Sequence, residues 1–180
     1  MNIIKILKDH IRTFHDYKSA SVNIFEIFIF IVIPIVISFV LVFNFNKKLS
    51  PAHISNAITA LSIFAALLFS LPILLYDVLE RTLMIDAENE TQEQQLADRR
   101  DLIQEINSNV SFAILSSFAS VIFLFLIQIS SLPEIIIQIL NFITISLGIV
   151  FSLTVLFLLK RVHCLLSFDL SKLIKKKDKD

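Results

Sequence analysis

The stretch IIIQILNFITISLGIVFSLTVLFLL, residues 135–159, contains no Asp, Glu, Lys or Arg. Three other windows of the chain share this property, namely residues 27–46, 49–76 and 106–133. About 20 apolar residues in a helix cross the roughly 30 Å hydrocarbon core of a bilayer, and each window reaches that length. A soluble chain of 180 residues could not bury four such segments in its core, because its surface needs polar side chains. The sequence therefore predicts an all-α integral membrane protein with four transmembrane helices.

The helix-start and helix-break signals refine these windows. Asn23 and Glu26 have capping-box spacing ahead of the first window, and Pro34 inside it should kink the helix. Ser50 suits the N-cap position and Pro51 the first position of the second helix. We expect transmembrane helices at residues 23–45, 51–78, 108–130 and 133–160, joined on one side by two turns too short to form an extracellular domain.

The basic residues predict the orientation of these four helices. With an even number of spans, both termini lie on one side of the membrane together with the segment between the second and third helices. That side holds fourteen of the sixteen Lys and Arg residues, whereas the other holds only Lys47 and Lys48. Because cytoplasmic loops are enriched in Lys and Arg, both termini are expected in the cytosol, and the membrane is expected to be the inner (plasma) membrane of a cell.

The long polar stretch of the chain is ERTLMIDAENETQEQQLADRRDLIQEIN, residues 80–107, with eight acids and three bases. Apolar residues at helical spacing flank a turn-like centre, so we expect residues 79–107 to form a cytosolic acidic helical hairpin. Its predicted seam places Leu79 and Leu83 against Leu96, Ile103 and Ile106. Its acids either surround an inner channel mouth, dock a partner, or only cover a solvated stalk. The candidates for the first two roles are Glu26, Asp86, Glu88, Glu90 and Glu93.

The two ends of the chain are amphipathic or basic. Residues 1–20 place apolar side chains at helical spacing, which predicts a cytosolic amphipathic helix that lies on the inner leaflet or packs on a cytosolic part of the protein. Residues 161–180 form a cytosolic basic tail. Its candidates for contact with anionic lipid, or with a nucleotide or oligonucleotide, are Lys172, Lys175, Lys176 and Lys177.

The sequence predicts no enzyme, because the motifs that carry enzyme chemistry are missing from it. A single glycine, Gly148, excludes a phosphate-binding loop and a dinucleotide fingerprint. The four histidines lack zinc-site spacing, so we expect them at interfacial or surface positions and predict no metal and no cofactor. The single cysteine, Cys164, is expected to be structural, with palmitoylation as the alternative. The charge-free windows argue against proton-coupled transport and voltage sensing, which need ionisable groups within the membrane.

Small and weakly polar residues line one face of three of the predicted helices. In the second and third helices, helix packing is the favoured explanation for Thr59, Ser62, Ala65 and Ala66, and for Ala113, Ser116, Ser117 and Ser120. In the fourth helix the stripe is longer and includes two amides, so a water-lined path and helix packing remain equally open. The candidate pore-lining residues are Gln138, Asn141, Thr144, Gly148 and Ser152, all within about 60° of Asn141.

A conducting path would require several copies of the chain, because one four-helix bundle has a filled core. We expect a homo-oligomer around a symmetry axis, with a tetramer as the working assumption. The first helix, rich in Ile, Val and Phe, would then face lipid.

The chain resembles small multi-span membrane effectors of bacterial anti-phage defence, such as the Hailong-type channel effector, with the Kiwa membrane subunit as an alternative. The resemblance lies in size, four predicted spans, minimal outer turns and the segment LPILLYDVLERT, residues 71–82, at the end of the second span. It implies an oligomeric ion channel, gated by a cytosolic regulatory protein or nucleotide ligand, whose opening depolarises the cell. The alternatives are a non-conducting membrane sensor or scaffold that recruits a cytosolic partner, and a holin-like lesion former.

Overall fold

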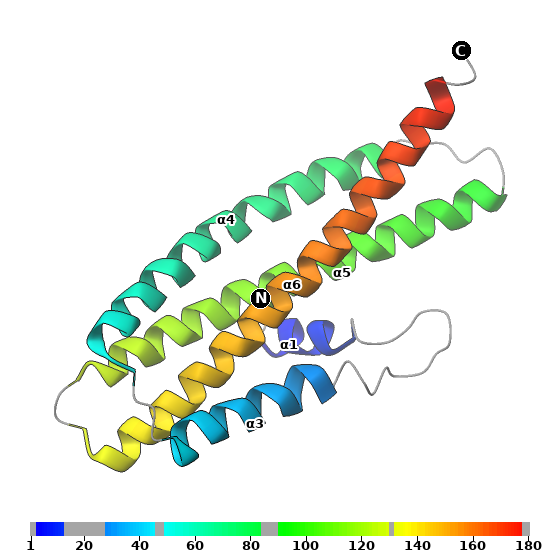
Figure 1. The fold of residues 1–180 in the computed structure, drawn as a ribbon. Helices are drawn as coiled ribbons and strands as arrows, with labels where there is room; N and C mark the ends of the chain where they lie inside the picture. The colour runs from blue at the N-terminus through cyan, green and yellow to red at the C-terminus, as the bar shows by residue number, and fades with distance from the viewer. Residues whose placement is uncertain (1–2, 13–27, 46–48, 84–89, 130–131, 178–180) are drawn as a thin grey trace.

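The structure is a computed structural model that describes residues 3–12, 28–45, 49–83, 90–129 and 132–177 (Figure 1). The regular elements within these ranges are all helical. In chain order they are α1 (Ile3–Arg12), η1 (Phe28–Val32), α3 (Ile33–Phe39), η2 (Val40–Asn44), α4 (Pro51–Leu83), α5 (Glu90–Ile127) and α6 (Glu134–Lys177).

Three of the helices are long and apolar enough to cross a membrane. The qualifying stretches are Pro51–Val78 in α4, Leu96–Ile127 in α5 and Glu134–Ser167 in α6. Together with the all-helical architecture, they identify a helical membrane protein, as the sequence predicts. The segment predicted as the first span is a shorter apolar helix, Phe28–Asn44, and Glu26 at its predicted start lies outside the described residues.

This shorter helix is irregular around its proline. A wide π-helical turn, η1, precedes Pro34, which occupies the first turn of α3, and a second π-helical turn, η2, ends the segment. Proline has no N–H to donate to the carbonyl four residues earlier, so the helix before it cannot keep regular α-helical bonding. The second helix behaves differently, because α4 continues as α-helix through Pro72.

Helix α5 lies at the centre of the bundle. It packs against both α4 and α6, and α3 packs against α6 (Figure 1). The order of neighbours is therefore α4, α5, α6, α3, which leaves α4 at one edge. We call the end of the bundle that holds residues 49–50, 128–129 and 132–133 the turn end, and the end that holds Leu83, Glu90 and Lys177 the tail end.

The core of the bundle follows α5 along its length. Ile106, Val110 and Ala113 are buried there and meet residues of α4 and α6 such as Leu68 and Phe151. The small residues of α5 are also covered by neighbouring helices, so the packing role predicted for them is confirmed; they are Ala113, Ser116, Ser117 and Ser120. The three serine hydroxyls donate to backbone carbonyls of their own helix, which removes the cost of burying them.

All three long helices extend past the length that a bilayer needs. Helix α4 reaches Leu83 and α5 starts at Glu90, so two helical arms leave the bundle at the tail end. Leu96, Ile103 and Ile106 of the predicted seam are buried. Helix α6 runs without a break through residue 160 to Lys177, about 66 Å at 1.5 Å per residue, so most of the predicted basic tail is its continuation.

Candidate functional site

The predicted polar stripe of the fourth span is divided between two environments in α6. Asn141 and Thr144 are buried inside the chain, Gln138 and Gly148 are partly exposed, and Ser152 is exposed. A side chain built at Gly148 would meet no atom of this chain within 4 Å. The five residues therefore do not share one open surface within a single chain.

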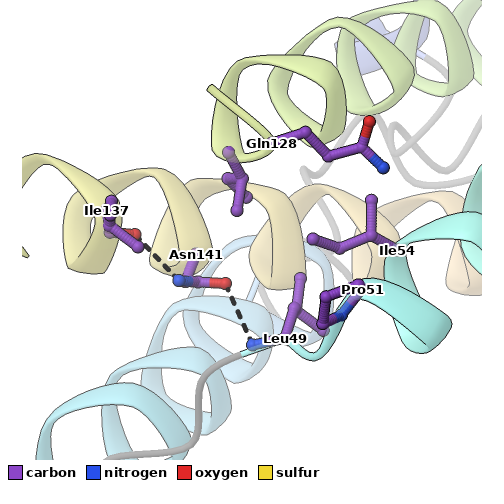
Figure 2. A pocket seen from close by; sticks show the side chains of 7 residues that line it. Leu49, Pro51, Ile54, Gln128, Ile137 and Asn141 are labelled. Atoms are coloured by element: carbon purple, nitrogen blue, oxygen red, sulfur yellow. Dashed lines mark hydrogen bonds between the residues drawn. The ribbon is translucent and has the colours of Figure 1, made fainter. Parts of the chain in front are cut away.

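Asn141 holds the turn end of the bundle together. Its Oδ1 accepts a hydrogen bond from the backbone N–H of Leu49 at 3.3 Å, and its Nδ2 donates to the carbonyl of Ile137 at 2.9 Å (Figure 2). The first bond joins the turn ahead of α4 to α6, two segments 92 residues apart in sequence. Asn141 thus satisfies the N–H of Leu49, which lies outside the helices and would otherwise lack this partner in an apolar surrounding.

A cavity of about 450 Å³ lies beside this amide at the turn end (Figure 2). Its lining is mostly apolar, with one further polar side chain, Gln128; the lining residues are Leu49, Pro51, Ile54, Ile127, Gln128, Ile137 and Asn141. Ser50 caps α4 next to it, because its Oγ accepts the backbone N–H of His53 at 3.3 Å, the arrangement predicted from the sequence.

The predicted charged candidates lie toward the tail end where the structure describes them. Glu90 begins α5, and Glu93 is exposed in its first turns, whereas Asp86 and Glu88, like Glu26, lie outside the described residues. The last turns of α6 contain Lys172, Lys175, Lys176 and Lys177. Within the described ranges no three His, Cys, Asp or Glu side chains come close enough to hold a metal ion.

One buried polar side chain contradicts the position predicted from the sequence. His10 of α1, expected at an interfacial or surface position, is only 5% exposed. Its Nδ1 lies 2.7 Å from Oδ1 of Asn109 on α5, and since an amide oxygen only accepts, the imidazole donates from Nδ1. The His10 ring stacks on Phe112 with 3.8 Å between centroids and 8° between planes. His53 and His163, in contrast, are exposed as predicted.

Aromatic and charged side chains of two further elements complete the surroundings of His10. Phe30 of η1 meets its ring edge-on, with centroids 6.0 Å apart, and also meets Phe157 of α6 at 5.2 Å. One turn along α6, Arg161 forms an ion pair of 3.2 Å with Glu105 of α5. We call these residues the His10 cluster: His10, Phe30, Glu105, Asn109, Phe112, Phe157 and Arg161. Residues of four elements meet in it.

Burial controls the charge of the imidazole. Removal from water lowers the pKa of His10 from its ordinary 6.5 to about 4, the hydrogen bond to Asn109 opposes this, and the positive charge of Arg161 lowers the pKa further. His10 is therefore neutral near pH 7. A neutral ring can stack face to face on Phe112 without the cost of burying a charge.

A second feature is an outward polar face on α4. At 100° per residue, five small or hydroxylic residues fall in an arc about 80° wide on the side opposite the helix's buried residues. They are Ser55, Thr59, Ser62, Ala66 and Ser70, and all are exposed in the single chain. We call them the α4 polar face. Sequence reasoning assigned Thr59, Ser62, Ala65 and Ala66 to packing, but of these only Ala65 is buried within the chain.

Comparison of the chain with protein-family models, with curated proteins and with solved structures found no match.

Proposed function

We propose that the protein is a homo-oligomeric ion channel of a bacterial inner membrane, opened from the cytosolic side. In this proposal both termini and the helical arms of the tail end lie in the cytosol, as the distribution of Lys and Arg favours. The segment Phe28–Asn44 serves as a fourth span: it has 17 residues, the lower limit for crossing a bilayer, and is about 25 Å long.

The observation that carries the proposal is the exposure of the α4 polar face. Helix α4 is an edge helix, and this face points away from the bundle. Two of its hydroxyls, those of Thr59 and Ser70, donate to carbonyls of their own helix at 3.0 and 2.6 Å. Small residues gain little from contact with lipid. They suit positions where another membrane helix approaches closely, and small polar residues also suit positions that border water. The face thus fits an interface or an aqueous path between copies.

The charge at the tail end of α4 agrees with a cation path. Asp77 and Glu80 are exposed and continue the same face at helical spacing. Copies arranged around an axis would bring these carboxylates together at the cytosolic mouth and raise the local cation concentration there. Ser152 and Gly148 of α6 form a second candidate lining, since Ser152 is exposed and a side chain built at Gly148 would meet no atom of this chain within 4 Å.

The proposed biological role is that of an anti-phage defence effector whose opening collapses the membrane potential. This role rests on the architectural resemblance described above, together with the tail-end arms, which offer a regulatory partner a cytosolic surface.

Ion flux from liposomes tests the proposal. Purified protein should migrate as an oligomer in mild detergent and release a trapped cation. A Thr59→Leu/Ser62→Leu double variant should reduce the flux at least about tenfold, because each change fills the polar face with a bulky apolar side chain. Leu67→Phe is the matched control, since Leu67 is exposed on α4 outside the polar face. A monomer with no flux, with or without its cytosolic regulator, would contradict the proposal.

A non-conducting scaffold that recruits a cytosolic partner is the second candidate. It is favoured by Asn141 and Thr144, which are buried within the chain, and by the exposed acids of the α5 arm, such as Glu93 and Asp98. In that case Glu93→Lys/Asp98→Lys should abolish capture of the partner protein from cell extract, while the purified protein stays electrically silent. Flux from the purified protein would exclude this candidate.

A further inference from the structure

Helix α1 presents two different surfaces. Near its C-terminal end His10 is buried against α5, whereas the apolar side chains of its first two turns are open: Ile3, Ile4 and Leu7 are 58%, 71% and 42% exposed. These three fall within an arc about 100° wide. Lys8 follows beyond Ile4 around the helix and Lys5 follows Lys8, and both lysines are exposed. The open part of α1 is therefore an apolar strip bordered by positive charge.

The position of α1 in the fold indicates what covers this strip. Through the contact of His10 with Phe30, α1 lies beside η1, where the apolar segment Phe28–Asn44 begins (Figure 1). Phe28 and Ile31 of η1 are about half exposed, so exposed apolar side chains of the proposed first span lie close to the docked end of α1. Bordering lysines suit phosphate groups at the edge of the hydrocarbon.

We propose that α1 binds anionic phospholipid of the adjoining leaflet, with Ile3, Ile4 and Leu7 among the upper acyl chains and Lys5 and Lys8 at the headgroups. His10 fixes the end of the helix to the bundle, so α1 lies between the helix bundle and the lipids of that leaflet. Near an anionic surface each lysine strengthens binding about fivefold. The sequence left two alternatives for this helix, contact with the leaflet and packing on the protein. In this proposal α1 makes both contacts. The inference requires the membrane spans but not ion conduction.

Tryptophan fluorescence provides the test. The chain contains no Trp, so all Trp emission comes from the single residue that is introduced. Leu7→Trp protein is reconstituted in vesicles of phosphatidylglycerol and phosphatidylcholine with brominated acyl chains, which quench only fluorophores that contact lipid. Ile63→Trp, on an exposed mid-span position of α4, is the lipid-contact control. Gln94→Trp, on the exposed arm of α5, is the water control.

Leu7→Trp should be quenched to a degree comparable with Ile63→Trp, most strongly by bromine near the headgroup, whereas Gln94→Trp should be unaffected. Adding Lys5→Gln/Lys8→Gln should weaken the quenching in anionic vesicles and change little in pure phosphatidylcholine. If acrylamide in the water quenches Leu7→Trp and bromolipid does not, the strip is not in lipid and the inference fails. Protection from both quenchers would mean that a second copy covers it, which also overturns the inference. Loss of quenching at Ile63→Trp would instead contradict the membrane spans.

Discussion

Nδ1 of His10 and Oδ1 of Asn109 lie 2.7 Å apart and join the N-terminal helix to the central helix of the bundle across 99 residues of sequence. The bond is buried, and the ring that makes it also stacks on Phe112. One uncharged imidazole therefore contributes both a hydrogen bond and a ring contact to the docking of α1.

The docking of α1 is expected to weaken in acid. The pKa of docked His10 is about 4 and that of a free imidazole is about 6.5, so the docked form is the poorer proton acceptor. The contribution of neutral His10 to the docking of α1 is fully present above about pH 6.5 and is lost as the pH falls toward 4. Between about pH 7.5 and about pH 5 the docking equilibrium should fall about thirtyfold. Other charged groups lie near the site. They are Glu105 and Arg161 of the His10 cluster, together with Lys160 and Asp9, and a variant that changes only His10 keeps all of them.

Hydrogen exchange over residues 3–12 measures this docking, with His10→Phe as the control compared at each pH. Phenylalanine keeps an aromatic ring at the site but does not titrate. The wild-type helix should lose protection relative to His10→Phe only in acid. Equal pH dependence in the two proteins would contradict the assignment to His10.

Removal of the Asn109 amide should destabilise the protein. Asn109→Ala leaves the buried Nδ1–H of His10 without its acceptor, which costs about 1–3 kcal/mol of unfolding free energy. Unfolding in mixed detergent and dodecyl sulfate measures the change. Asn107→Ala, at an exposed position on the same helix, should cost less than about 0.5 kcal/mol. Equal effects of the two substitutions would show that the bond between His10 and Asn109 adds nothing to the free energy of unfolding.

The ion pair between Glu105 and Arg161 should be energetically coupled. The two side chains are 19% and 12% exposed and 3.2 Å apart, so the pair is screened less than a surface pair. A double-mutant cycle of Glu105→Gln and Arg161→Gln should give a coupling energy of about 1 kcal/mol that persists in high salt. Additive effects of the single changes would place both groups in water.

Cysteine accessibility can distinguish the candidate linings of the proposed path. In a Cys164→Ser background, Thr59→Cys on the α4 polar face should react with a small water-soluble thiol reagent and change the flux. Ala65→Cys, which is buried on the same helix, should not react. Reaction at Ser152→Cys instead of Thr59→Cys would assign the path to α6.

The single cysteine tests the orientation of the protein. Cys164 is exposed at the tail end, so a membrane-impermeant maleimide should label it in inside-out vesicles but not in intact spheroplasts. A Cys164→Ser/Ala52→Cys variant, with its thiol exposed at the turn end, should give the reverse pattern. Labelling of Cys164 in intact spheroplasts would place both termini outside the cytosol.

The long helices follow from local properties of the sequence. A bilayer admits helical backbone because it offers no other hydrogen-bond partner, so long charge-free windows predicted α4, α5 and α6. Local chemistry predicted the start of α4, where Ser50 caps the helix ahead of Pro51. The wide turns around Pro34 were less predictable. Pro34 lies between two π-helical turns, whereas α4 continues as α-helix through Pro72, so the effect of a proline on a helix depends on its surroundings.

Which polar faces are covered depends on how the helices pack, and local sequence does not encode this. Periodicity places Asn141 and Ser152 on one face of α6 and Ser62 on one face of α4, but not which neighbour lies against each. The turn before α4 covers Asn141, while the edge position of α4 leaves Ser62 open. His10 lies on a face of α1 whose spacing alone suits water, lipid or protein. Its burial follows from the packing of α1 on α5, a contact between segments about a hundred residues apart that no local pattern encodes.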